Sequence, residues 1–217
     1  DLMRMAGPIF FVIVSKILCY GGMTLRCTSL GVESLAAQSI LMRFWFFFGC
    51  FGDALSQTAQ SFLPVSLYPT FSKEKFASMF RKLVYIASFG GLGNALVSNA
   101  ILQKLGGYLT NDIVIVDIMR QQTGFMGSSL LLHALTMLLE GTVIASRDFN
   151  TLFVTYSVTL LLHFGILTFF AETFGAIWRT FLLFQTTRLG LYSWRVWRRR
   201  RQQNEAELQH QRLMLSL

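Results

Sequence analysis

Charged residues are scarce in this sequence, and the recurring motifs of soluble enzymes are missing from it. Only 14% of the 217 residues are charged, whereas 53% are hydrophobic, and the mean hydropathy is +0.50. This composition is too apolar for an ordinary soluble domain of this length. No GxSxG, HExxH, CxxC or Walker A motif is present, and the FGGLGNA stretch at 89–95 lacks the Lys-Ser/Thr ending of a phosphate loop. We therefore expect a membrane protein whose surface contacts lipid, and we do not expect an enzyme.

Cysteine is also rare. The three cysteines, Cys19, Cys27 and Cys50, lie in or beside apolar stretches without metal-ligand or redox spacing. We expect them to be buried apolar side chains, and we expect no metal site and no cofactor. The sequence starts at Asp1 and becomes apolar almost at once, without the basic head and cleavage site of a signal peptide. We expect that a further N-terminal portion precedes it.

Six apolar segments are long enough to be membrane spans. A spanning helix needs about 20 mostly apolar residues, because each backbone polar group must be hydrogen-bonded within its own helix. The approximate spans are 6–25, 34–55, 82–103, 117–145, 151–170 and 173–194. The sequence therefore predicts an all-α bundle of six transmembrane helices over residues 1–195, followed by a basic and then polar cytoplasmic tail over 196–217.

Lysine and arginine are distributed unevenly between the loops on the two sides of the membrane. With the N-terminus placed in the cytoplasm, eleven basic residues near span ends lie inside and two, Arg26 and Lys104, lie outside. The inside set is Arg4, Lys73, Lys75, Arg81, Lys82, Arg147, Arg195, Arg198, Arg199, Arg200 and Arg201. Because such residues concentrate on the cytoplasmic side, both ends are predicted to be cytoplasmic. Membrane orientation thus explains the net charge of +8, and we expect no nucleic-acid partner.

Aromatic and basic residues cluster directly after the last predicted span. The cluster consists of Trp194, Trp197, Arg198, Arg199, Arg200 and Arg201. Tryptophan is enriched where a helix leaves the membrane, and neighbouring arginines interact with anionic headgroups. We interpret this cluster as a membrane-interface anchor.

The fourth predicted span carries the most polar residues. His133, Thr136 and Glu140 follow one another at i, i+3 and i+7, which places them on one face of a helix. An ionisable residue at the centre of a membrane helix costs at least ~2.5 kcal/mol, so it normally faces a cavity or a partner. We favour a cavity in which Glu140 or His133 exchanges a proton during transport. The alternative is a hydrogen-bond network that only holds the spans together.

Two further polar features point to the same membrane interior. Asp53, Gln57 and Gln60 form a stripe on the second predicted span that would suit the wall of an aqueous path, or Asp53 caps or pairs locally near the membrane surface. Lys16 lies in the middle of the first span, too far from either end to reach the membrane surface comfortably. Its anionic partner is expected to be Glu140, Asp53 or a carboxylate of the substrate.

Two segments resemble a known transporter family. LGVESLAAQSILMRFWFFFGCFGDALSQTAQSFLP at 30–64 and LLEGTVIASRDFN at 138–150 resemble segments in the C-terminal lobe of the multidrug and toxic compound extrusion (MATE) family, closest to its plant and algal branch. The resemblance covers residues 6–195. It implies twelve spans in two six-helix lobes and export of organic solutes against an inward flow of H⁺ or Na⁺. Glu140 falls where many members carry an acidic residue in the tenth span.

The first span departs from the family pattern. Many members carry an acidic residue in their seventh span, whereas the corresponding segment here, GPIFFVIVSKILCYGG, contains only Lys16. In this respect the chain resembles members associated with organic-anion export, which implies a carboxylate-bearing substrate.

These observations predict a solute:cation antiporter that works by alternating access. The expected partners are the lipid bilayer, a small organic solute, and either an N-terminal six-helix lobe or a second copy of the chain. The alternatives are a flippase for lipid-linked substrates and a non-transporting membrane scaffold. An intramembrane enzyme is disfavoured, because His133 and Glu140 lack companions for a hydrolytic triad. The resemblance agrees with plasma membrane, vacuole or plastid envelope alike.

Overall fold

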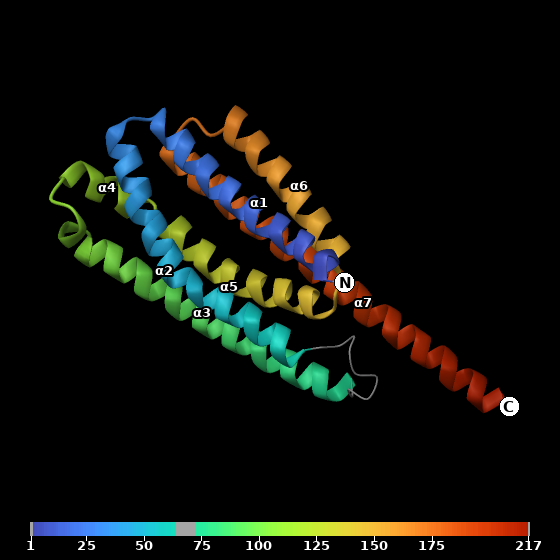
Figure 1. Ribbon diagram of the computed structural model, residues 1–217. Helices are drawn as coiled ribbons and strands as arrows, with labels where there is room; N and C mark the ends of the chain where they lie inside the picture. The colour runs from blue at the N-terminus through green and yellow to red at the C-terminus, as the bar shows by residue number, and fades with distance from the viewer. Residues whose placement is uncertain (1, 64–72, 217) are drawn as a thin grey trace.

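The computed structural model describes residues 2–63 and 73–216, with side chains described for 6–63, 75–199 and 201. Within these residues the chain is entirely helical and contains no strand (Figure 1). The helices are α1 (Leu2–Thr28), α2 (Val32–Phe62), α3 (Lys73–Leu109), α4 (Ile113–Gln121), α5 (Thr123–Ala145), α6 (Phe149–Phe169) and α7 (Phe174–Ser216). The predicted all-α membrane helix bundle is confirmed.

Five of the described helices are long and apolar enough to cross a membrane: α1 from Ala6, α2, α3 from Lys75, α5 and α6. The sixth predicted span, 173–194, coincides with the first half of α7, which is not one of these five. Two arginines and a glutamine, Arg179, Gln185 and Arg188, interrupt the apolar character of this stretch. Two of them, Gln185 and Arg188, are fully buried, so α7 is held in the bundle by polar contacts as well as by apolar packing.

The fourth predicted span, 117–145, is divided in the structure. It consists of the short helix α4 and the longer helix α5, joined at Gln122. The helical stretch also begins before the predicted start, because Asp112 caps α4 by accepting hydrogen bonds from the backbone N–H groups of Val114 and Ile115 at 2.9 and 3.4 Å. An aspartate directly before an apolar run is a preferred N-cap, so this boundary was readable from the sequence.

The segment predicted as a cytoplasmic tail, 196–217, is helical up to Ser216. Helix α7 continues through the predicted start of the tail at 196, and the position of the tail outside the membrane stays a prediction. The helix projects well beyond the other helices at the end of the bundle where the N-terminus lies (Figure 1).

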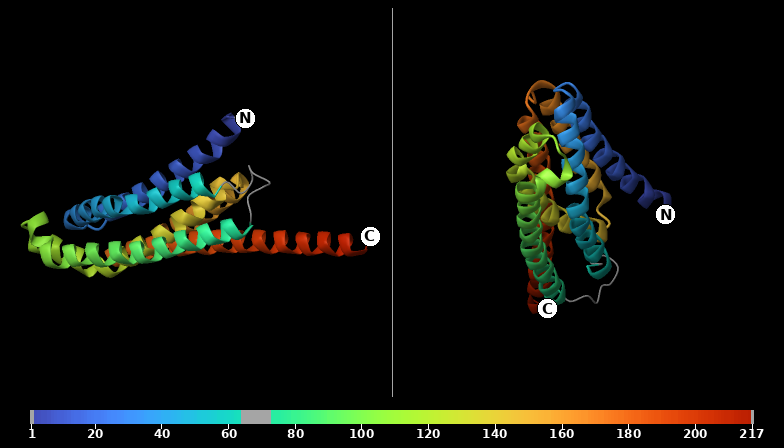
Figure 2. Two further views of the ribbon diagram at one scale, coloured as in Figure 1. Left: turned by 90° about the horizontal axis from the view of Figure 1, so that it is seen from below. Right: turned by 90° about the vertical axis from the view of Figure 1, so that its left-hand side faces the viewer.

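Helix α5 is the centre of the bundle. It packs against α2, α3 and α7, while α6 packs against both α1 and α7. Seen from below, α1 and α2 lie on one side and α3 and α7 on the other (Figure 2). The contact between α5 and α2 is close because Gly141 faces the backbone of Ser56, where a Cβ would lie 2.8 Å from the Ser56 Cα.

The helices alternate in direction, which brings the predicted cytoplasmic segments to one end of the bundle. The N-terminus, the start of α3 and the turn between α5 and α6 lie at the end from which α7 projects (Figure 1). The exposed Arg81 and Lys82 belong to this end. The arrangement is the one expected for an even number of spans, and which side faces the cytoplasm stays a prediction.

The cysteine prediction holds for two residues and is wrong for the third. Cys19 and Cys27 are fully buried, whereas Cys50 is exposed. Cys50 lies one turn after Phe46 and Phe47, which are 47% and 74% exposed. This face of α2 points out of the bundle, so an apolar neighbourhood in sequence did not mean burial here.

Candidate functional site

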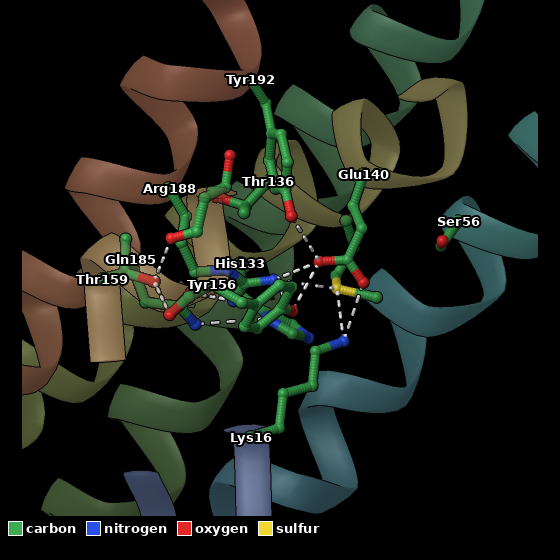
Figure 3. Close-up of polar contacts among 12 residues, drawn as sticks. Lys16, Ser56, His133, Thr136, Glu140, Tyr156, Thr159, Gln185, Arg188 and Tyr192 are labelled. Carbon is green, nitrogen blue, oxygen red and sulfur yellow. Dashed lines mark hydrogen bonds and ion pairs between the residues drawn. The ribbon is translucent and has the colours of Figure 1, made fainter. Parts of the chain in front are cut away.

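Glu140 is the centre of a buried ion-pair cluster to which four helices contribute. Its carboxylate lies on α5, and Lys16 Nζ from α1 donates to Oε1 at 2.9 Å. The Tyr156 hydroxyl from α6 donates to Oε2 at 2.7 Å, and Arg188 from α7 donates to the same oxygen. Arg188 also donates to the Tyr156 hydroxyl at 2.5 Å. We call Lys16, Glu140, Tyr156 and Arg188 the Glu140 cluster (Figure 3).

The members of the Glu140 cluster differ in their access to the surroundings. The side chains of Arg188 and Glu140 are 0% and 3% exposed, whereas that of Lys16 is 18% exposed. A buried charge is strongly destabilising unless it is paired, so Glu140 and Arg188 depend on each other. Lys16 is the one ion of the cluster that can be reached from outside, and the cluster carries two cations for one carboxylate.

A hydrogen-bond relay connects the Glu140 cluster to His133. Arg188 Nη1 donates to Gln185 Oε1 at 3.0 Å, and Gln185 Nε2 lies 3.2 Å from His133 Nδ1. Because Arg188 fixes the amide oxygen, the amide NH₂ faces the imidazole, and Nδ1 must accept the bond. This assigns the neutral tautomer with the proton on Nε2. His133 and Glu140 are therefore linked, as their shared helix face suggested, but through two residues of α7.

Helix α2 closes the opposite side of His133. The rings of Trp45 and His133 lie 4.7 Å apart, and Trp45 Nε1 donates to Ser129 Oγ at 3.0 Å. Gly52 permits this approach, since a Cβ there would lie 2.7 Å from the imidazole, whereas a Cβ on the neighbouring Gly49 would be in ordinary van der Waals contact at 3.7 Å. The imidazole is thus enclosed between α2, α5 and α7.

Thr136 and the α2 stripe are placed differently from the Glu140 cluster. Thr136 is buried, but its hydroxyl donates to the Leu132 carbonyl of its own helix at 2.7 Å. Asp53, Gln57 and Gln60 are exposed, and Gln60 Nε2 lies 3.2 Å from Ser56 Oγ. None of the described hydrogen bonds joins these four predicted site residues to Glu140. Exposure agrees with an aqueous wall, which stays a prediction.

The predicted interface anchor forms two aromatic–arginine pairs. Trp194 and Trp197 are 53% and 57% exposed. The guanidinium of Arg198 lies 5.2 Å from the Trp194 ring centroid, and that of Arg201 lies 5.8 Å from the Trp197 ring centroid. Arg199 Nη1 donates to the Ser146 carbonyl at 3.4 Å. The Arg200 side chain, also part of the predicted anchor, lies outside the described residues.

A second ion pair fixes the end of the bundle near this anchor. Arg195 Nε donates to Asp148 Oδ2 at 2.6 Å, which joins the turn between α5 and α6 to α7. Asp148 Oδ1 also caps α6 by accepting from the Thr151 N–H at 3.3 Å. Partial burial alone would raise the pKa of Asp148, but the hydrogen bonds from Arg195 and Thr151 outweigh it and hold the pKa below its ordinary value.

Three residues of the site were missed by the sequence analysis: Tyr156, Gln185 and Arg188. A usable signal was present, because Gln185, Arg188 and Tyr192 follow at i, i+3 and i+7 within a predicted span. An arginine inside a span is a functional candidate by default. Tyr156 carries no such signal, since an isolated tyrosine in an apolar helix is typical of packing. In the part of the chain that the structure describes, no group of three or more His, Cys, Asp or Glu side chains is placed to hold a metal ion.

The chain is similar to two plant proteins. It is 33% identical over 196 residues to Protein DETOXIFICATION 47, chloroplastic, from Arabidopsis thaliana, across 87% of this chain and 35% of that protein. It is 27% identical over 173 residues to Protein DETOXIFICATION 44, chloroplastic, from the same plant, across 76% of this chain and 32% of that protein.

The chain thus spans about a third of the length of these curated relatives, with 35% and 32% of them covered. No protein-family model matches the chain, and no solved structure matches it. The helical bundle, the apolar helices and both similarities agree with the resemblance seen in the sequence. The chain is an integral, multi-pass membrane protein that belongs to the multidrug and toxic compound extrusion (MATE) family, in which it corresponds to the C-terminal lobe.

Proposed function

We propose that this chain is one lobe of a secondary transporter that exchanges organic compounds for H⁺ or Na⁺ by alternating access. The observation that carries the proposal is the Glu140 cluster, in which one carboxylate connects α1, α5, α6 and α7 inside a membrane lobe. Placing an ionisable group inside a membrane costs free energy, and such groups therefore mark functional sites. The names of the two relatives refer to detoxification, which agrees with the export of organic compounds. Membership of the family confirms the expectation that the chain is not an enzyme.

Glu140 is our candidate for the site of the coupling ion. Among the described side chains, Oε2 accepts from Arg188, Tyr156 and, at 3.5 Å, Tyr192, whereas Oε1 accepts from Lys16 alone. A proton or sodium ion therefore reaches the carboxylate most easily at Oε1, after the Lys16 ammonium moves away. Arg188 stays in place during this exchange, because it has no exposed surface and is tied to Gln185 as well.

We propose an organic anion as the substrate. Once separated from Glu140, the Lys16 ammonium needs another anion, and the cluster already contains one cation more than it has carboxylates. Lys16 is also the exposed member of the cluster. A substrate carboxylate would satisfy it with a charge-assisted hydrogen bond.

The proposed transporter needs a second lobe. Alternating access is a rocking of two lobes about a central site, and this chain supplies one of them. We propose that the partner is the N-terminal lobe of the same transporter, with a second copy of the chain as the alternative. Both relatives carry the word chloroplastic in their names, so a plastid envelope is the membrane we propose.

Transport by the full-length protein in proteoliposomes tests the proposal. A panel of carboxylate, neutral and cationic solutes is offered under an imposed H⁺ or Na⁺ gradient of either direction. Exchange predicts that a carboxylate solute accumulates when the ion gradient points out of the vesicle. Accumulation only with an inward gradient would contradict exchange, and no uptake of any solute would favour the flippase or scaffold alternatives.

Water access separates a transporter from a scaffold. In a full-length variant from which all native cysteines, Cys19, Cys27 and Cys50 included, have been removed, Gln57→Cys and Thr136→Cys are exposed to a membrane-impermeant thiol reagent during transport. Leu161→Cys is the matched control, because Leu161 is 75% exposed on an apolar helix and would face lipid. Labelling at 57 and 136 but not at 161 supports an aqueous path, whereas protection at all three positions supports the scaffold.

A further inference from the structure

An apolar groove lies on the outer side of the bundle, between α3, α5 and α7. Its volume is about 380 Å³. The lining is apolar apart from Ser193 and includes Phe80, Val84, Leu135, Leu138, Leu189 and Trp197. An apolar concavity of this kind marks a binding surface, and on a membrane lobe the surrounding medium is lipid.

The groove has a basic end. Trp197 lines the groove, and the Arg201 guanidinium lies 5.8 Å from its ring centroid, one turn further along α7. Arg199 lies between them in sequence and donates to the Ser146 carbonyl, which follows the C-terminus of α5. The positive charge is therefore placed where two of the three helices that form the groove approach the membrane surface.

We propose that this groove binds one anionic phospholipid. An acyl chain lies along α3, α5 and α7, and the phosphate interacts with Arg201, which lies beside Trp197 at the end of the groove. Charge complementarity selects this occupant, because an apolar groove that ends in an arginine beside an interfacial tryptophan matches an amphiphile with a negative head. A helix of a partner lobe would need the apolar groove but not the basic end.

The opposite side of α7 provides a built-in comparison. There, Trp194 and Arg198 form a second pair, at 5.2 Å, beside a smaller hollow of about 220 Å³. That hollow has apolar lining residues too, Val154, Val158 and Leu191 among them, but Asn150, Thr151 and Arg195 add polar groups, and Arg195 is paired with Asp148. The two sides share the aromatic–arginine pair but differ in the volume of the hollow and in the polarity of its lining, so we expect the Trp197 side to retain a lipid in preference to the Trp194 side.

Quenching of tryptophan fluorescence by brominated lipid distinguishes the two sides. The full chain is placed in phosphatidylcholine vesicles with a minor fraction of phosphatidylglycerol, and one of the two lipids carries brominated acyl chains. The Trp194→Phe variant reports on Trp197, the Trp197→Phe variant reports on Trp194, and the double variant gives the signal of the buried Trp45 and Trp178. We expect brominated phosphatidylglycerol to quench Trp197 well above its share of the lipid, and Trp194 only in proportion to that share.

Two substitutions in the Trp194→Phe variant test the two parts of the site. Arg201→Gln is expected to lower the preference for phosphatidylglycerol about fivefold, the effect of one interfacial cation, whereas Arg198→Gln leaves it unchanged. Ser193→Phe, at an exposed position of the lining, is expected to fill the groove and remove the quenching. Equal quenching of Trp197 by both lipids, or equal effects of Arg201→Gln and Arg198→Gln, would overturn the proposal. Absence of quenching by either lipid would also overturn it and would show that protein covers the groove.

Discussion

Lys16 Nζ and Glu140 Oε1 lie 2.9 Å apart although 124 positions separate the two residues in the sequence. The pair is asymmetric, because the Lys16 side chain is 18% exposed and that of Glu140 is 3% exposed. Glu140 keeps a second cation, Arg188, when Lys16 leaves. The Glu140 cluster therefore contains a fixed part, Glu140 with Arg188, and an exchangeable part, Lys16.

Arg188→Met is expected to lower the free energy of unfolding by about 3–5 kcal/mol, because it leaves Glu140 buried with fewer charged partners. Unfolding of the purified chain in detergent by increasing dodecyl sulfate measures the change. Arg179→Met is the matched control on the same helix, since Arg179 is exposed, and it should stay within about 0.5 kcal/mol of the wild type. The double variant, Arg188→Met with Glu140→Leu, should lose less free energy of unfolding than the sum of the losses of the two single variants. Strict additivity would show that the two side chains do not stabilise each other.

Lys16→Gln is expected to affect transport more than stability. A charge-assisted hydrogen bond to a substrate carboxylate contributes about 1.5–3 kcal/mol, so the transport of carboxylate solutes should fall roughly tenfold or more while that of neutral solutes changes little. The initial uptake rates of a carboxylate and a matched neutral amide, measured in the same proteoliposomes, give the ratio. An equal decrease for both solutes would contradict binding of the substrate carboxylate by Lys16.

The Asp148–Arg195 pair predicts a stability change in acid. The pKa of Asp148 is lower in the folded state than its ordinary value of 3.8, so its contribution is complete above that value and is lost as the pH falls through the folded pKa. Asp148→Asn should therefore cost up to about 1 kcal/mol near neutral pH and nothing in strong acid. Unfolding measured for both proteins over this range gives the difference, and a gap that is constant with pH would rule out the ion pair as its source.

Gly141→Ala is expected to destabilise the contact between α2 and α5. The new methyl group would lie 2.8 Å from the Ser56 Cα, and overpacking of this kind costs about 1–3 kcal/mol. Gly124→Ala on the same helix has no atom within 4 Å of the added carbon and should be neutral or stabilising by up to about 1 kcal/mol. Unfolding in dodecyl sulfate compares the two variants. Equal behaviour would mean that α2 and α5 are not as close as the structure has them.

The positions of most helices could be predicted from the sequence, but two helix boundaries could not. Long apolar segments identify α1, α2, α3 and α6, because a spanning helix must satisfy its backbone internally. The division between α4 and α5 at Gln122 was missed because no proline marks it and polar residues run through it. The continuation of α7 to Ser216 was missed because the end of an apolar segment was taken as the end of a helix.

The sequence identified ionisable residues of the candidate site, but not the hydrogen bonds between helices that join them. Depth in the membrane singled out Lys16 and Glu140, and the ion pair between them was one of three alternatives for Lys16. The link from Glu140 to His133 runs through Arg188 and Gln185, and no spacing within one helix can show a contact made by another. Thr136 shares the predicted face, yet its hydroxyl donates to the Leu132 carbonyl of its own helix. A threonine within a helix can form this hydrogen bond to the carbonyl four residues earlier without any partner from another helix.

We propose that Glu140 couples ion flow to solute transport, and one substitution tests this role most directly. Gradient-driven uptake is measured in proteoliposomes of the full-length protein as wild type, as Glu140→Gln and as Glu172→Gln, whose exposed carboxylate provides the matched control. We predict that Glu140→Gln removes the response to the ion gradient while Glu172→Gln keeps it. Uptake by Glu140→Gln at the wild-type rate, with the same dependence on pH, would contradict the account.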